Sequence, residues 1–556
     1  MRVYEAIGET LKRLEVRATF GLMGDGNLRF MTYLAHELGM PYYAARHEGG
    51  AVAMADGYAR VTGEVGVCSV TQGPGVTNAL TALTEARKAG SPLLLLAGDS
   101  PMRFLRHNQD VDQTAIFNSV GVAVERVRSP DTVVTDVARA FNRALATQRP
   151  VAMQFPTDIQ DLACDTASLD AVNVQPPPGS RPPADVISRA AELIVSSKRP
   201  AIIAGRGAVR ANARQALERL AEQIGALLAT TAQAKGLFSG NPFYVGSSGG
   251  FASPLGERLL PEADLILAFG ASLNHWTTRN RELFAQSVRV VQCDVDGSAI
   301  GALTPVDLGL AGDAAATAEA LSEELSRRRF NLAGFRIDEV QAQIAAFRLD
   351  DFHDRSNGRT IDPRTLMLKL DAILPRDRTV VLDSGHCMGW AAVYLSAPDA
   401  AGFIFSNDFQ AVGLGLGTAF GASIARPDRL TVLTPGDGGL MMSLGELETF
   451  VRYEIPLLVI VINDAAYGAE VHLLQNVGLP SDRALFRDND FAAIASAMGA
   501  QGMTVRDLTD LERLPTWLDE RRGPMVVDCK VDPQLRGDWF SKVFAPGGWY
   551  QRMCGH

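Results

Sequence analysis

The stretch PGDGGLMMSLGELETFVRYEIPLLVIVINDAAYG, residues 435–468, contains one unit of the pattern on which this chain is built. A glycine-rich turn carrying Asp437 leads into a helical segment, an apolar strand and a second polar turn at Asn463 and Asp464. Near-continuous apolar strands between helices are typical of parallel sheets that are covered on both faces. Ligands of such sheets bind beyond the carboxyl ends of the strands, where both turns should lie.

The same alternation of apolar runs and helical patterns occurs in three blocks. ATFGLM at 18–23, PAIIAG at 200–205 and RTVVLD at 378–383 are examples of the strand-like runs. A segment rich in Pro and Gly at 174–183 and a charged connector between 326 and 365 separate the blocks. We therefore predict an α/β fold of three doubly wound parallel-sheet domains. Their expected bounds are 1–170, 184–325 and 360–532, with a C-terminal tail at 533–556.

Length and composition narrow the class of protein. The 556 residues suit about three domains of ordinary size. A formal net charge of −10 without a long basic run is poorly suited to binding nucleic acid or an anionic membrane. The longest apolar strand is too short to cross a bilayer, and the charged N-terminus does not resemble a signal peptide. Six scattered Cys without a CxxC pair indicate reduced thiols, so we expect a cytoplasmic protein.

The two turns of the opening stretch suit a cation that bridges protein and phosphate. Gly436, Gly438 and Gly439 allow a ligand to approach the backbone, and the helix that follows favours a phosphate at its N-terminus. Asp437 would repel that phosphate unless a cation lay between them. Asp464, 27 residues later, can reach the same cation. Two carboxylates, phosphate oxygens and water suit Mg²⁺. Each turn alone is common, but the pair at this spacing predicts a magnesium–diphosphate clamp.

This pair of turns resembles the signature of thiamin diphosphate-dependent enzymes, a GDG motif followed at this spacing by an Asn-containing turn. The resemblance extends over nearly the whole chain, to the decarboxylases and acetohydroxyacid synthases of that family. It implies a pyrimidine-binding first domain, a central Rossmann-like domain and a third domain that binds diphosphate and Mg²⁺. The implied metal ligands are Asp437, Asp464 and the backbone carbonyl of Ala466. Asp464 is a departure, because the family usually has Asn at that position.

The first block contains RHEGGAVAMADGYAR, residues 46–60, which resembles the motif of the family's essential glutamate. The resemblance implies that Glu48 hydrogen-bonds N1′ of the cofactor pyrimidine and promotes formation of the reactive thiazolium ylid. It also implies that Val412 separates the two cofactor rings, although Val is smaller than the usual Met, Leu or Ile. The other implied cofactor contacts are Gly385, His386, the carbonyl of Gln410, Gly436, Gly438, Gly439 and Asn463.

Three further residues indicate whether the chain is more similar to the decarboxylases or to the synthases of the family. FGLMGDGNL, residues 20–28, resembles the decarboxylases and implies that Asp25 lies beside the reacting carbon. His107 stands at the second position of the decarboxylases' His–His pair, with Arg106 at the first. Glu470 follows Asp464 at the spacing of their second catalytic glutamate. Asp25, His107 and Glu470 are thus expected to form a proton relay. The segment that contains His107 also resembles the synthases, through Gln109, Asp110 and Gln113.

The central block and the tail are less informative. AGRGAVRA, residues 204–211, lacks the G-x-G-x-x-G spacing, and FGASLNHWTTRN, residues 269–280, replaces the synthases' flavin-associated run. FAD is therefore disfavoured as a cofactor. His275 in that run either reaches the substrate pocket, where a related decarboxylase branch has a central-domain His, or is a surface-loop histidine, which we favour. The aromatic C-terminal tail is either a lid over the active site or a segment packed on the surface.

The prediction is a thiamin diphosphate- and Mg²⁺-dependent lyase or transferase that decarboxylates a 2-oxo acid. The resulting enamine is protonated to an aldehyde or captured by a second carbonyl compound. The resemblance implies a homodimer or homotetramer with active sites at subunit interfaces. Three alternatives are an acetolactate synthase- or pyruvate oxidase-like flavoenzyme, a carbon–carbon lyase acting on a diketone, acyloin or acyl-CoA, and a catalytically silent nucleotide-binding scaffold. The joint presence of Glu48, Asp437 and Asp464 argues against the scaffold.

Overall fold

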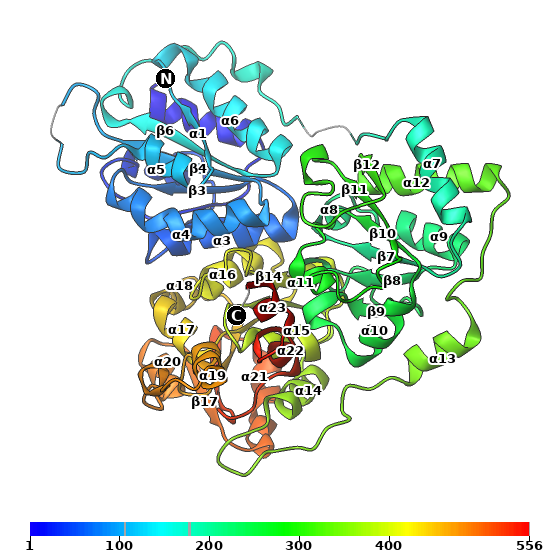
Figure 1. Ribbon diagram of the computed structural model, residues 1–556. Helices are drawn as coiled ribbons and strands as arrows, with labels where there is room; N and C mark the ends of the chain where they lie inside the picture. The colour runs from blue at the N-terminus through cyan, green and yellow to red at the C-terminus, as the bar shows by residue number, and fades with distance from the viewer. Residues whose placement is uncertain (105–106, 176–178, 555–556) are drawn as a thin grey trace.

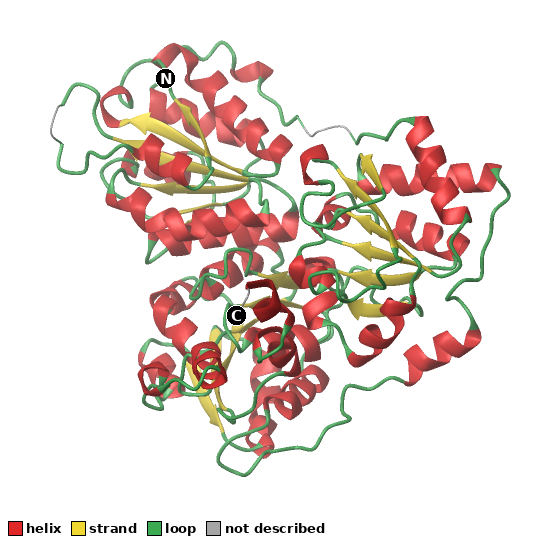
Figure 2. Ribbon diagram, viewed as in Figure 1, coloured by secondary structure: helices red, strands yellow, loops and turns green. Residues whose placement is uncertain are grey.

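The structure is a computed structural model that describes residues 1–104, 107–175 and 179–554. It contains three six-stranded parallel sheets, each covered by helices on both faces (Figures 1 and 2). The strands are buried because they lie between helical layers, as in β4 and β16, where every residue is buried. The predicted fold class, three doubly wound α/β domains, is confirmed.

The first sheet has the strand order β2-β1-β3-β4-β6-β5. Its strands are β1 (Thr19–Gly21), β2 (Tyr42–Ala44), β3 (Gly66–Val70), β4 (Leu93–Asp99), β5 (Ala123–Arg126) and β6 (Pro150–Pro156). Its α-helices are α1 (Val3–Arg13), α2 (Leu28–Thr32), α3 (Glu48–Thr62), α4 (Pro74–Ala89), α5 (Gln113–Ser119) and α6 (Val133–Thr147). The chain leaves β1 toward one edge and β3 toward the other, so the switch point of this sheet lies between β1 and β3.

The central sheet has the order β12-β11-β10-β7-β8-β9, with its switch point between β7 and β10. Its strands are β7 (Pro200–Ala204), β8 (Leu227–Thr230), β9 (Tyr244–Ser247), β10 (Leu265–Phe269), β11 (Arg289–Asp294) and β12 (Leu308–Ala311). Its helices are α7 (Ala184–Val195), α8 (Arg206–Arg210), α9 (Arg214–Ile224), α10 (Pro254–Leu259), α11 (His275–Thr278) and α12 (Ala314–Arg327). α13 (Asp338–Ala346) lies in the connector to the third domain.

The third sheet has the order β14-β13-β15-β16-β18-β17, with its switch point between β13 and β15. Its strands are β13 (Arg378–Leu382), β14 (Phe403–Phe405), β15 (Leu430–Thr434), β16 (Leu457–Asn463), β17 (Gln501–Val505) and β18 (Pro524–Lys530). Its helices are α14 (Pro363–Ile373), α15 (Met388–Tyr394), α16 (Gly415–Ala425), α17 (Asp437–Ser443), α18 (Gly445–Arg452), α19 (Gly468–Asn476), α20 (Phe491–Ala497) and α21 (Leu514–Glu520). The tail adds α22 (Asp538–Phe544) and α23 (Trp549–Cys554).

The first and third domains meet where α3 packs against α16 (Figure 1). Glycines let the two backbones touch. A Cβ on Gly57 would lie 2.2 Å from the carbonyl oxygen of Thr418, and one on Gly421 would lie 1.8 Å from that of Met54. A larger residue at either position would push the helices apart. We call this contact the glycine seam.

The C-terminal tail packs between the third and central domains. Trp539 of α22 lies against Gly389 and the ring of His386, and Trp549 of α23 lies against Trp276 of the central domain. Lys542 pairs with Glu257 across the same boundary. The tail is therefore part of the contact between two domains. Among the helices in the described part of the chain, none has the length and apolar character needed to cross a membrane.

Candidate active site

Asp437 and Asp464 come together beside the switch point of the third sheet. Asp437 opens α17 directly after β15, and Asp464 follows β16, so both lie at carboxyl ends of neighbouring strands. Asp437 is only 4% exposed, and its Oδ1 has no hydrogen-bond partner among the described residues. Burial raises the pKa of Asp437 to about 6, and burial together with the charge of Asp437 raises the pKa of Asp464 well above its usual value. Two facing carboxylates of this kind fit a bound cation.

The carboxylates of Asp437 and Asp464 also suit a small, hard cation that takes its other ligands from oxygen atoms outside this pair. No group of three or more His, Cys, Asp or Glu side chains in the described ranges is arranged to hold a metal. A cation at Asp437 and Asp464 would therefore draw its remaining ligands from backbone, cofactor and water, as Mg²⁺ does. Ala466 lies two residues after Asp464, in the same turn, and pairs with Leu485 in an isolated bridge. Its carbonyl remains the predicted third protein ligand.

The glycines around Asp437 form a cradle that side chains would fill. A Cβ on Gly438 would lie 2.6 Å from the ring of Tyr467, and one on Gly439 would lie 2.7 Å from the Asp383 carboxylate. A Cβ on Gly436 would lie 3.2 Å from Cys387 Sγ. Space for a diphosphate against this backbone thus depends on glycine, which fits the predicted role of the three residues.

Asn463 shapes the second turn through its side chain. Its Nδ2 donates to Asp528 at 2.8 Å, and its Oδ1 accepts from the backbone N–H of Ala465 at 3.1 Å. Ala465 adopts a φ of 53°, an uncommon conformation for a non-glycine residue. These contacts hold the turn that presents Asp464. The predicted direct contact of Asn463 with the cofactor stays a prediction.

The segment that carries Gln410 and Val412 lies beside the cradle. A Cβ on Gly439 would lie 3.1 Å from Val412 Cγ1, so Val412 reaches the GDG turn. Val412 is 36% exposed in the single chain. Gln410 adopts a φ of 60°, and the backbone N–H of Gly413 donates to both Asp383 oxygens at 3.1 Å. Burial raises the pKa of Asp383 to about 6.

His386 is covered by the C-terminal tail, and Gly385 just before it adopts a φ of 119°. The Nε2 atom of His386 accepts from the backbone N–H of Gly537 at 3.2 Å. Its ring packs against His472, 4.8 Å between centroids, and against Trp539. Burial, reinforced by the neighbouring His472, lowers the pKa of His386 to about 3.

The first domain presents Glu48 at the N-terminus of α3. The side chain is buried, and its Oε2 accepts from Asn78 Nδ2 of α4 at 3.1 Å. Glu446 of α18, which sequence reasoning missed, accepts from the backbone N–H groups of Arg46 and His47 at 2.9–3.2 Å. The third domain of the same chain therefore holds the turn that leads into Glu48. A buried Glu in an ordinary helical pattern gave no sequence signal for this contact.

Asp25 and His107 belong to one hydrogen-bond chain at the switch point of the first sheet. Asp25 accepts from Thr71 and Gln72 at 3.0–3.1 Å. Gln72 also donates to Gln109 Oε1 at 2.8 Å, and the Gln109 N–H donates to His107 Nδ1 at 3.3 Å. Arg106 lies outside the described residues.

Glu470, the third predicted relay residue, and Gln113, one of the synthase-like positions, are placed differently. Glu470 is exposed on α19 of the third domain, and no hydrogen bond among the described residues joins it to Asp25 or His107. Gln113 accepts from the N–H of Gly73 at 2.9 Å and donates to the carbonyl of Gly98, which supports the loop after β3. Within one chain, therefore, two of the three relay residues come together.

A cleft of about 1450 Å³ opens at the switch point of the central sheet, between the three domains. Its lining includes Arg206 and Gly270, which follow β7 and β10, and Gln410 from the third domain. His275 also lines it, half-buried against Trp276 and Trp549, so it is not a free surface-loop histidine. Burial lowers the pKa of His275.

Three family models match successive parts of this chain. The N-terminal TPP binding domain of thiamine pyrophosphate enzymes matches residues 1–116, the central domain 187–321, and the C-terminal TPP binding domain 383–529. Curated relatives cover nearly the whole chain. A probable acetolactate synthase large subunit of Methanocaldococcus jannaschii is 26% identical over 549 residues, 96% of this chain and 92% of the relative.

Two further relatives are an acetyltransferase and a second acetolactate synthase. A sulfoacetaldehyde acetyltransferase of Castellaniella defragrans is 28% identical, with 91% of this chain and 88% of the relative covered. Acetolactate synthase isozyme 3 large subunit of Escherichia coli is also 28% identical, with 95% and 96% covered.

Proposed function

Because this chain belongs to the family of thiamine pyrophosphate (thiamin diphosphate) enzymes, we propose that it decarboxylates a 2-oxo acid and transfers the remaining acyl unit. The acceptor is a proton, which gives an aldehyde, or a second carbonyl compound, which gives an acyloin or acetohydroxy acid. The observation that carries the proposal is the pairing of buried Asp437 with Asp464 beside the glycine cradle. The name of the acetolactate synthase relatives favours the second outcome, and that of the acetyltransferase relative favours transfer of an acyl unit.

The residues would divide the work of holding the cofactor. Asp437, Asp464 and the Ala466 carbonyl would hold Mg²⁺, and Gly436, Gly438 and Gly439 leave room for the diphosphate. When bound, thiamin diphosphate supplies a nucleophilic carbon and an electron sink for the decarboxylation. Glu48 would hold a proton at the pyrimidine ring, and Val412 would hold the two rings apart. We propose that no FAD takes part.

Asp25 and His107 would manage protons on the substrate side. The Asp25 carboxyl and the His107 imidazole, joined through Gln72 and Gln109, can give a proton to a carbonyl oxygen or take one from a hydroxyl group. Glu470 projects from the third domain and would join them only if a partner subunit brought the two domains together. The proton relay thus requires a second copy of the chain.

Exposed apolar side chains support an assembly in which partner subunits complete the site. They lie in segments that follow strand carboxyl ends in both outer domains, where a partner subunit could cover them. They are Met23, Leu28, Met102, Phe104 and Val111 in the first domain, and Phe409, Val412, Met441, Met442, Leu473 and Leu479 in the third. We propose a homodimer or homotetramer with active sites between subunits. The five cysteines with described side chains are unpaired, which supports a cytoplasmic location.

The test is carbon dioxide release from a panel of 2-oxo acids, with and without thiamin diphosphate and Mg²⁺. Products are identified by mass spectrometry, and visible absorbance of the purified protein reports any flavin. We expect release that depends on both cofactors, from a colourless protein. A folded protein that binds thiamin diphosphate but turns over no 2-oxo acid would instead favour cleavage of a diketone, acyloin or acyl-CoA. A protein that does not bind thiamin diphosphate would overturn the proposal.

A further inference from the structure

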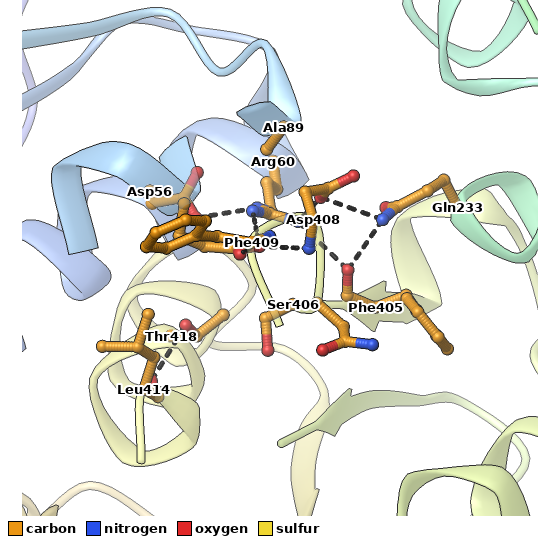
Figure 3. Close-up of polar contacts among 12 residues, drawn as sticks. Asp56, Arg60, Ala89, Gln233, Phe405, Ser406, Asp408, Phe409, Leu414 and Thr418 are labelled. Atoms are coloured by element: carbon orange, nitrogen blue, oxygen red, sulfur yellow. Dashed lines mark hydrogen bonds and ion pairs between the residues drawn. The ribbon is translucent and has the colours of Figure 1, made fainter. Parts of the chain in front are cut away.

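A buried ionic cluster joins all three domains directly before the segment that carries Gln410 and Val412 (Figure 3). Its centre is Arg60, whose side chain is 4% exposed at the C-terminal end of α3. Arg60 donates to Asp56 at 2.8 Å, to Glu85 at 2.9 Å and to Asp408 at 3.1 Å. One guanidinium group thus connects two helices of the first domain with a loop of the third.

Glu85 of α4 grips the backbone of that loop. Its Oε1 accepts from the N–H of Asp408 at 2.9 Å, and its Oε2 accepts from the N–H of Phe409 at 2.5 Å. The Glu85 side chain is 2% exposed, so water does not compete for these bonds. Two successive backbone amides, the last two before Gln410, are therefore fixed to the first domain.

The central domain holds the same point from the other side. Asp408 Oδ2 also accepts from Gln233 Nε2 at 3.0 Å and from Arg206 Nη2 at 3.3 Å. Gln233 and Arg60 both donate to the carbonyl of Phe405, at 2.9 and 3.2 Å (Figure 3). The loop after β14 is thus bonded to side chains of both other domains.

The far end of the loop is fixed as well, by the bonds from Gly413 to Asp383. Only residues 410–412 span the gap between the two anchors. Within this gap Gln410 has a φ of 60°, a conformation that costs a non-glycine residue free energy and persists only where the surroundings enforce it. The hydrogen-bonded residues 408–409 and 413 flank it on both sides.

We propose that Glu85 and Arg60 are positioning residues that hold residues 410–412 in the conformation that receives thiamin diphosphate. The inference rests on the proposed function, since Gln410 and Val412 matter only if the cofactor binds there. Without the bonds that Glu85 and Arg60 make to residues 405–409, Gln410 relaxes to negative φ. This change turns its carbonyl and displaces Val412 from the cradle. Neither residue touches the cofactor itself.

The test compares Glu85→Gln and Arg60→Lys with Asp136→Asn. Asp136 is also a buried, ion-paired carboxylate of the first domain, but its partners are Arg128, Thr132 and Arg139. Glu85→Gln removes the negative charge of the side chain. It also places an amide NH₂ group, which can only donate, against one of the two backbone N–H groups of Asp408 and Phe409. We expect Glu85→Gln and Arg60→Lys to raise the dissociation constant for thiamin diphosphate by about tenfold or more. The constant is measured by calorimetric titration with thiamin diphosphate in the presence of Mg²⁺. Asp136→Asn should leave it unchanged.

A second substitution separates positioning from general destabilisation. Gly adopts a φ near 60° without strain, and Gln410→Gly keeps the backbone carbonyl. Glu85→Gln combined with Gln410→Gly should therefore recover most of the lost affinity and the near-ultraviolet circular dichroism of the bound cofactor. Unchanged affinity in folded Glu85→Gln, or no recovery in the double variant, would overturn the inference. If the wild-type protein itself fails to bind thiamin diphosphate, the proposed function is overturned, and the positioning role of Glu85 and Arg60 is overturned with it.

Discussion

Glu48 is the residue on which turnover should depend most directly. Glu48→Gln keeps an oxygen that can accept from Asn78 but cannot hold or release the proton. We expect carbon dioxide release to fall by about a hundredfold or more, the range of general acid–base catalysis. Binding of thiamin diphosphate, measured by calorimetry, should persist. Full activity in this variant would contradict the role of Glu48.

Asp464 should lower the stability of the folded protein when no cation is present. Its pKa and that of Asp437 are raised in the folded protein, so the folded state binds more protons and loses stability as pH rises through about 6. Asp464→Asn removes one of the two charges. Without Mg²⁺, we expect its unfolding temperature above pH 6 to exceed that of the wild type by ~2–4 °C.

The comparison needs a surface control and both metal conditions. Asp482→Asn, at an exposed carboxylate, should leave the unfolding temperature unchanged. Thermal unfolding is followed with EDTA and with Mg²⁺, and Mg²⁺ should stabilise the wild type more than Asp464→Asn. Equal pH dependence in wild type and Asp464→Asn would show that the pair does not carry this charge repulsion.

At the scale of single elements, docking of the tail helix α22 should depend on pH through His386. The folded-state pKa of about 3 lies below the ordinary value of 6.5, so the undocked state binds more protons. Docking is lost as pH falls from about 6.5 toward 3, by up to ~1.4 kcal/mol per pH unit. His386→Asn keeps an acceptor for the Gly537 N–H and should remove most of this dependence.

Limited proteolysis measures tail docking directly. Cleavage in the tail of the wild type should accelerate as pH is lowered from about 7 to about 5, more steeply than in His386→Asn. His36→Asn is the control, since His36 is an exposed histidine of the first domain. A cleavage rate that responds identically to pH in wild type and His386→Asn would assign the dependence to other groups.

The strands were predictable from sequence, but the contacts between elements were not. Apolar runs such as PLLVIVI identified β16, and the paired turns identified the neighbourhood of Asp437 and Asp464. Glu446 and Glu85 gave no signal, because a buried Glu that accepts backbone N–H groups from another domain looks like any helical Glu. Arg60 was part of a recognised motif, yet its partners lie up to 348 residues away in sequence. Long-range pairing of this kind follows from tertiary structure alone.

At the scale of the whole molecule, mixing two inactive variants tests whether subunits share the site. Glu48→Gln damages the first-domain half, and Asp437→Asn damages the third-domain half. If each site combines halves from two chains, a mixed dimer contains one intact site. After random exchange, about a quarter of wild-type activity should return. Sites formed within single chains would restore none, because every chain carries a damaged half.

The experiment requires that subunits exchange, which light scattering or native mass spectrometry of a tagged and an untagged variant can confirm. Glu48→Gln mixed with Glu48→Gln is the control and should remain inactive. Recovery that rises with protein concentration would further tie activity to assembly.

The glycine seam has a consequence for how this sequence can diverge. Gly57 and Gly421 do little for the separate domains, since each lies on a helix that could accept Ala. They matter because each meets a backbone carbonyl of the other domain, so no change in a facing side chain can compensate for a substitution. Drift at these positions is therefore blocked by the partner's main chain, and the two domains are inherited as a matched pair. A recombinant that exchanged one outer domain with a distant relative would keep the fit only if both glycines came with it.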